Sequence, residues 1–132
     1  MQASILYDAG AALVVFGAGL IIFTLIISVI EAVVMLLLKW GKFWRSLWVS
    51  LLMNVISTIF GIVGARVGSL EFSIYSFKWL PIVIAFLLSV LIEAGVLILA
   101  KRGATRLNWL VSFTANTASY LLVILPLFRL MD

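Results

Sequence analysis

Two glutamates lie inside long apolar stretches of this chain, and each has an asparagine at a matching distance on the next apolar stretch. Glu31 precedes Asn54 by 23 residues, and Glu93 precedes Asn116 by the same number. A carboxyl group in apolar surroundings can bind a proton or a cation, or it can form a hydrogen bond with an amide. These four side chains are therefore the first candidates for a functional site.

The two Glu/Asn pairs belong to an internal repeat. The stretch Glu31 to Gly61 recurs 62 residues later as Glu93 to Val123 without a gap, and ten of the 31 aligned positions are identical. Six of the matches are polar residues or glycines, which composition alone does not explain: Glu31 with Glu93, Lys39 with Lys101, Gly41 with Gly103, Ser50 with Ser112, Asn54 with Asn116, and Ser57 with Ser119. The repeat predicts a duplicated helical hairpin.

Composition places both hairpins in a lipid bilayer. Of 132 residues, 66% are hydrophobic and only 11% are charged, far from the balance of a soluble protein. Four apolar runs are long enough to cross about 30 Å of hydrocarbon as helices: about Ala11 to Leu38, Leu47 to Ala65, Leu80 to Ala100, and Leu107 to Leu127. We expect one all-α domain, residues 1–132, with four transmembrane helices. Repeat 1 spans about 11–65, repeat 2 spans about 80–127, and the connection 69–79 lies along the membrane surface.

The charges predict how this domain is oriented. Six basic residues flank the two short turns, three in each: Lys39, Lys42 and Arg45, then Lys101, Arg102 and Arg106. Only three basic residues lie on the opposite side, so the positive-inside rule places both turns in the cytoplasm and both termini outside. Aromatic residues at the turns, Trp40, Trp44, Trp48 and Trp109, are typical of a membrane interface. We expect the six cations to contact lipid headgroups in a multi-pass protein of a bacterial inner membrane or another energy-transducing membrane.

Helical geometry places the two Glu/Asn pairs at one depth. Glu31 lies eight residues before Lys39 and Asn54 nine residues after Arg45, so both are about 12 to 14 Å from their turn. The second hairpin has nearly the same spacing. Serines on the same helix faces extend each pair into a polar stripe that should face protein or water: Ser28, Ser50 and Ser57, then Ser89, Ser112 and Ser119.

This polar layer has two interpretations. An ionised carboxylate at this depth costs about 2.5 to 3.5 kcal/mol on an insertion scale, and one interhelical hydrogen bond returns only about 0.6 to 2 kcal/mol. Either each Glu is protonated and donates to its Asn carbonyl as a structural latch, which we favour, or the stripes enclose water or a cation and form a transport pathway.

The amino-acid composition limits the classes of function that this chain is expected to have. The chain has no Cys and no His, so we expect no enzyme activity, no metal site and no cofactor. The favoured function is a non-catalytic accessory or scaffold subunit of a larger membrane complex. Its expected partners are membrane lipids and other transmembrane subunits or further copies of itself, not nucleic acid. The alternative is a small oligomeric transporter or channel that uses the Glu/Asn layer as a cation or proton pathway.

A strip of small residues on the second helix predicts a close helix contact. It comprises Gly61, Gly64 and Gly68, with the Gly-x-x-x-Gly spacing at its end. We favour packing within the chain, for which Gly17 and Gly19 on the first helix are the nearest candidates. Assembly with another subunit is the alternative.

Overall fold

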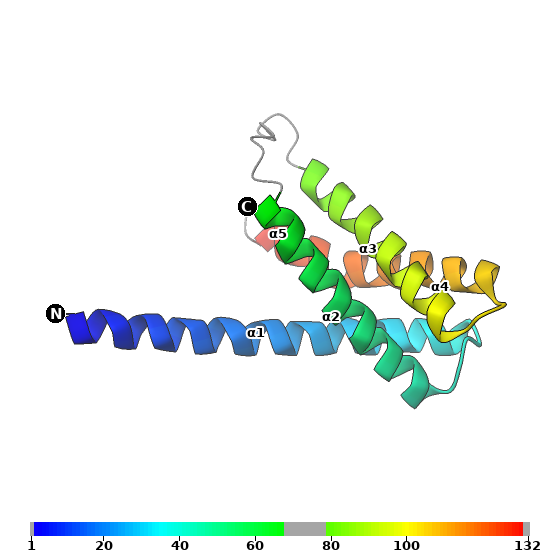
Figure 1. Cartoon of the computed structure of the whole chain (residues 1–132), viewed down its shortest axis with the longest axis horizontal. Coiled ribbons are helices and arrows are strands. Elements are labelled where there is room, and N and C mark those ends of the chain that lie inside the picture. The colour runs from blue at the N-terminus through cyan, green and yellow to red at the C-terminus, as the bar shows by residue number, and fades with distance from the viewer. Residues whose placement is uncertain (1, 68–78, 131–132) are drawn as a thin grey trace.

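The computed structural model describes residues 2–67 and 79–130, and within them the side chains of residues 14–15, 17–63, 79–127 and 129–130 (Figure 1). All regular structure in these ranges is helical. The helices are α1 (Gln2–Leu37), α2 (Phe43–Val67), α3 (Leu80–Ala100), α4 (Thr105–Ser119), the π-helical turn η2 (Tyr120–Ile124) and α5 (Leu125–Leu130).

The structure confirms the predicted all-helical fold with four helices that could cross a membrane. Four segments of 21 to 23 residues are long and apolar enough to cross a membrane: Gly17–Leu37, Phe43–Val63, Leu80–Ala100 and Thr105–Leu127. Pro81 lies in the first turn of α3, where a missing amide hydrogen leaves no helical bond unmade. Of the predicted surface connection 69–79, only Trp79 lies within the described residues, where it precedes α3.

The last span departs from the single helix that hydropathy predicts. The α-helix ends at Ser119, and five residues of π-helix follow before α5 begins at Leu125. Leu125 donates its amide hydrogen to the Tyr120 carbonyl, a bond one residue longer than in an α-helix. Pro126 follows directly, and its ring would clash with a carbonyl one turn earlier in a regular α-helix. The wider π turn accommodates this proline inside the span.

The four long helices pack as a ring. α1 contacts α2 and α4, and α3 contacts α4 and α2. α1 and α4 lie along each other while α2 and α3 run diagonally to them (Figure 1). Each helix therefore turns one face toward the centre of the bundle.

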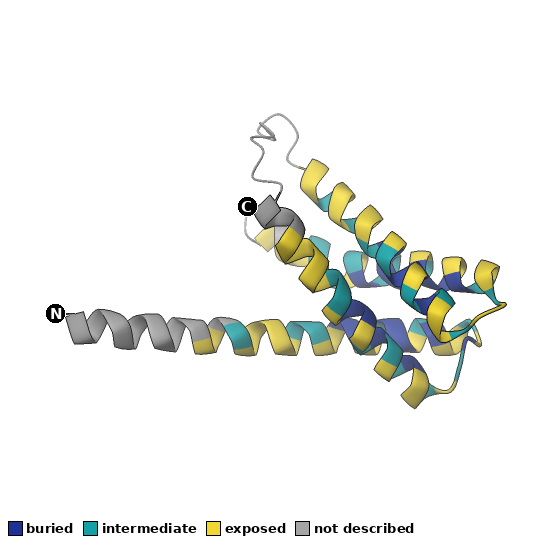
Figure 2. Ribbon diagram, viewed as in Figure 1, coloured by how far each residue is buried: buried dark blue, intermediate teal, exposed yellow. Residues whose placement is uncertain are grey.

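The packed core lies near the short connections 38–42 and 101–104, which we call the turn end. Its apolar part consists of Met35, Trp40, Met53, Leu97 and Val111. Figure 2 shows the buried residues gathered toward this end, whereas the other halves of α2 and α3 are mainly exposed. These exposed positions are apolar, as expected for surfaces that face acyl chains.

The two turns differ although they align in sequence. After α1, Lys39 takes a left-handed conformation with φ 55°, Lys39 N donates to Leu36 O at 3.0 Å, and Trp40 N donates to Met35 O at 2.9 Å. This is a Schellman motif, which brings the residue after the left-handed position back against the last helical turn. Trp40 consequently packs with Met35 in the core. After α3, the left-handed residue is instead Gly103, with φ 85°.

Candidate functional site

Glu31 is held between α1 and α2 near the centre of the bundle. The side chain is 1% exposed. Its Oε2 atom accepts hydrogen bonds from Ser50 Oγ at 2.7 Å and from Asn54 Nδ2 at 2.6 Å. Ser50 and Asn54 are one turn apart on α2, so both reach the same carboxyl oxygen. The carboxyl group thus acts as an acceptor for two donors of the neighbouring helix.

The direction of the Asn54 hydrogen bond is fixed by a second contact. Asn54 Nδ2 also lies 3.0 Å from the main-chain oxygen of Ser50, which can only accept. The amide nitrogen must therefore point toward both Ser50 O and Glu31. The expected latch, in which Glu donates to the Asn carbonyl, is wrong in this respect, because the main chain of α2 orients the amide as a donor.

Glu93 occupies the corresponding place between α3 and α4 but has fewer donors. Its Oε2 atom accepts a 2.5 Å hydrogen bond from Asn116 Nδ2, and Asn116 Nδ2 also donates to Ser112 O at 2.9 Å. The Ser112 hydroxyl, which aligns with that of Ser50, donates to Val90 O at 2.7 Å instead. Asn116 is therefore the side-chain donor of Glu93 within the described residues, and the two carboxyl groups are not equivalent.

Both Glu/Asn pairs are buried in the interior of the same four-helix bundle. Glu31 and Glu93 are each 1% exposed, and α1, which carries Glu31, contacts α4. Ser119 of α4 is also buried and donates its hydroxyl hydrogen to the Asn116 main-chain oxygen at 3.1 Å. We call these buried polar side chains together the carboxyl cluster: Glu31, Ser50, Asn54, Glu93, Asn116 and Ser119.

The remaining predicted serines border this cluster. Ser28 is fully buried and lies 3.3 Å from Asn54 Nδ2. Ser57 is half-buried and donates to the Asn54 main-chain oxygen at 3.2 Å, so it bonds to its own helix. Ser89 is half-buried on α3, one turn before Glu93, and the ring of Phe86 on the same helix packs against the ring of Tyr120, with 5.2 Å between the ring centres. Tyr120 was not predicted as a site residue, because in sequence it differs little from other aromatic residues near the ends of spans.

No family model matches the chain, and neither the curated proteins nor the solved structures contain a significant match. The function is therefore inferred from the geometry of the molecule itself.

A second polar cluster, centred on Trp40, joins the two hairpins at the turn end. Trp40 is 1% exposed, and its Nε1 donates to Asn108 Oδ1 at 2.7 Å. Lys101 Nζ donates to the Trp40 main-chain oxygen at 2.7 Å and lies 5.6 Å from the centre of the indole ring. Arg45 lies 5.3 Å from the same ring and donates to Ala100 O at 3.0 Å. We call these residues the turn clamp.

The turn clamp corrects one sequence-based prediction. Trp40 is not an interface residue, because the Schellman motif turns it into the core. Lys101, which is half-buried, and Arg45, which is exposed, also bond to the main chain, and their contacts with headgroups stay a prediction. The other four predicted headgroup residues, Lys39, Lys42, Arg102 and Arg106, are exposed. Asn108 was missed because its aligned counterpart is Ser46 and no asparagine match marked it.

The favoured packing of the glycine strip within the chain has no support at Gly61, the member of the strip whose surroundings the structure describes. A Cβ atom placed on Gly61 would meet nothing within 4 Å, and the same holds for Gly17 and Gly19. Because the helices diverge away from the turn end, this face of α2 has no intramolecular partner at Gly61. Gly64 lies within α2, its surroundings are not described, and Gly68 lies outside the described residues.

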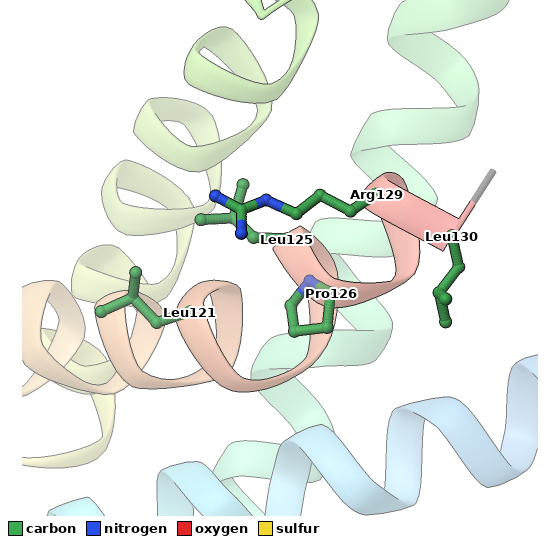
Figure 3. Close-up of a pocket in the computed structure, with 5 residues that line it drawn as sticks. All are labelled: Leu121, Leu125, Pro126, Arg129 and Leu130. Carbon is green, nitrogen blue, oxygen red and sulfur yellow. The ribbon is translucent and has the colours of Figure 1, made fainter. Parts of the chain in front are cut away.

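A pocket of about 460 Å³ lies along η2 and α5. Leu121, Leu125, Pro126, Arg129 and Leu130 line it, and Figure 3 shows the Arg129 side chain extending above Leu125. Its lining is mostly aliphatic and includes none of the clustered carboxyl, amide or hydroxyl groups. The chemistry of this protein therefore concentrates in the carboxyl cluster.

Proposed function

We propose that this protein is a non-catalytic integral membrane subunit or scaffold whose carboxyl cluster and turn clamp hold two helical hairpins together. The observation that carries this proposal is the internal use of the polar groups. Each Glu, Asn and Ser of the carboxyl cluster bonds to another part of the chain. Within the described residues, Ser46 Oγ is the buried side-chain polar atom that has no hydrogen-bond partner. Such a core supports structure and leaves the apolar exterior for partners.

The origin and orientation of the hairpins belong to the same proposal. The 62-residue repeat and the two corresponding Glu/Asn hydrogen bonds support descent from one duplicated hairpin, related by a pseudo-twofold axis along the membrane normal. The basic turns support a cytoplasmic turn end and external termini. The different turn conformations then reflect divergence after duplication.

Gly61 provides the test of assembly. If its open face docks on another transmembrane helix, Gly61→Leu should weaken self-association or partner binding about tenfold or more, because a close helix approach has no room for leucine. The measurement is co-purification and energy transfer between labelled chains in native lipid. The matched control is Gly95→Leu on α3, since a Cβ atom placed on Gly95 would also meet nothing within 4 Å. The same degree of association in the wild type and in both variants would contradict this proposal. Purification of the protein as a lone monomer would contradict it as well.

A second candidate function has one specific observation in its favour. Glu31 of α1 and Glu93 of α3 come from different hairpins and are both buried in the bundle, as residues of a cation or proton pathway between repeats would be. Ion transport by an oligomer of this chain is therefore the alternative.

Flux through liposomes tests this alternative. The double change Glu31→Gln and Glu93→Gln keeps an oxygen that accepts from Asn54 and Asn116, but it removes both titrating groups. Transport by these carboxyl groups predicts loss of proton or cation flux by at least tenfold in the double variant. Ser57→Ala, which alters a bond within one helix, should retain it. Flux that survives the double change would exclude the pathway.

A further inference from the structure

A groove runs along the exposed side of η2. One pocket of about 460 Å³ is lined by residues of η2 and α5, and a second of about 260 Å³ lies between α3 and the segment formed by α4 and η2. Leu121 and Leu125 line both pockets, so the two adjoin and form one groove. Their volumes together fall in the range of roughly 300 to 1,000 Å³ that is typical of sites for small molecules.

The part of the groove beside α3 has an apolar and aromatic lining. The half-buried rings of Phe86 and Tyr120 line it in contact with each other, with 5.2 Å between their centres, and Val83 beside them is 50% exposed. Thr117 also lines this part, but its hydroxyl donates to Phe113 O of its own helix at 2.7 Å. Such a surface suits a hydrocarbon chain, because it buries apolar area.

The part of the groove beside α5 carries a positive charge. Arg129 lines it four residues after Leu125, about 6 Å along the helix, and Figure 3 shows its side chain extending over Leu125. Within the described residues, no carboxylate pairs with the Arg129 guanidinium. A guanidinium can donate two parallel hydrogen bonds to the oxygens of a phosphate group. Arg129 can therefore bind a phosphate at the end of the apolar groove.

The groove lies at the depth that a phospholipid occupies. Trp79 lines it one residue before the span that begins at Leu80, and Arg129 lies two residues after the span that ends at Leu127. Both residues lie at the same membrane surface, because α3 and α4 are antiparallel neighbours. Tryptophan is enriched at this level, and arginine extends from it to the headgroups.

We propose that this groove binds one phospholipid of the leaflet opposite the turn end. Its phosphodiester group binds the Arg129 guanidinium, and one acyl chain lies against Phe86, Tyr120 and Leu121. The chain covers apolar surface that the protein leaves open, since Leu121 is 59% exposed. This site is separate from the basic turns at the other end of the bundle. The proposal depends only on the membrane location of the protein and goes beyond the proposed function.

Native mass spectrometry of the full chain in dodecyl maltoside tests the phosphate contact. Arg129→Gln should lower the affinity for added phosphatidylglycerol about tenfold, the usual effect of losing a charge-assisted hydrogen bond. Diacylglycerol has the same acyl chains without a phosphate, so it should bind equally to the wild type and to this variant. Equal affinity of the two proteins for phosphatidylglycerol would overturn the assignment.

The acyl-chain contact is tested by filling the groove. Val83→Trp should lower the affinity for both lipids about tenfold or more, because the larger side chain occupies the site of the acyl chain. The matched control is Leu91→Trp, at a similarly exposed position of α3 that lines neither pocket. It should bind like the wild type. Equal effects of the two tryptophan substitutions would contradict the proposal.

Quenching by a brominated lipid tests the place of binding. Trp79 lines the groove, and its emission is the difference between the wild type and Trp79→Phe. Phosphatidylglycerol with brominated acyl chains should quench this emission at the concentration at which the first lipid binds. Binding that leaves Trp79 unquenched, as at the basic turns, would refute the site. So would a lipid-free dimer that Val83→Trp dissociates, because a second copy would then fill the groove. Neither readout uses the Gly61 face or ion flux, so loss of lipid binding leaves the proposed function standing.

Discussion

Replacing Trp40 by alanine should destabilise the folded protein by about 3 to 5 kcal/mol, the usual cost of truncating a buried aromatic side chain. Trp40 is 1% exposed and packs in the apolar core at the turn end. The change also removes the hydrogen bond to Asn108 and the ring that Arg45 and Lys101 face. Because the turn clamp joins residues of both hairpins, their association should weaken most. Unfolding by steric trapping in bicelles measures the free energy.

Two further substitutions separate packing from hydrogen bonding at this position. Trp40→Phe keeps an aromatic ring but leaves Asn108 Oδ1 without its donor, which should cost about 1 to 3 kcal/mol. Trp44→Ala is the control, since Trp44 is 70% exposed in the first turn of α2. It should change stability by less than about 0.5 kcal/mol, as surface substitutions usually do. Similar losses for Trp40→Ala and Trp44→Ala would show that the turn clamp contributes nothing.

Asn116→Ala should destabilise the protein more than Asn54→Ala, although the two asparagines align in the repeat. Removing Asn116 takes away the side-chain donor of Glu93 and leaves a buried carboxyl group unpaired, at a cost of about 1 to 3 kcal/mol. Glu31 keeps the Ser50 hydroxyl as a donor when Asn54 is lost, so the cost there should stay near that of one interhelical hydrogen bond, about 0.6 to 2 kcal/mol.

A double-mutant cycle checks the reason for this difference. If the cost of Asn116→Ala arises at Glu93, then combining it with Glu93→Leu should recover part of the loss, with a coupling of about 0.5 to 3 kcal/mol. Ser57→Ala, which removes a bond within α2, provides the reference for a neutral polar deletion. Equal costs for the two asparagines, or strict additivity in the cycle, would refute the asymmetry of the carboxyl cluster.

Much of the fold and part of the cluster could be predicted from the sequence. Four apolar runs, each long enough for a bilayer, give four helices with little ambiguity, because a membrane span must satisfy its main-chain hydrogen bonds internally. The constant offset of Glu31 and Glu93 from Asn54 and Asn116 also placed each carboxyl group level with an amide. Each residue of a helix advances about 1.5 Å along its axis, so the number of residues between a side chain and its turn predicts the depth of that side chain in the membrane.

Contacts between the hairpins could not be predicted in this way. Spacing along a helix does not specify which helices are neighbours, so the contacts of α1 with α4 and of α2 with α3, and the hydrogen bond from Trp40 to Asn108, had no sequence signal. The π turn before Pro126 changes the direction in which the side chains after Ser119 point, and a hydropathy profile does not predict such a turn.

The sequence by itself determined that this chain lies in a membrane, how many helices cross it, and which polar residues share one depth, because these properties depend on composition and on the fixed rise of a helix. The tertiary structure alone decided which groups bond. The left-handed Lys39 turned Trp40 into the core, and the main chain of α2 oriented Asn54 as a donor. The ring of four helices buried both glutamate side chains. Each of these outcomes depends on local dihedral angles and on helix neighbours, which residue spacing does not fix.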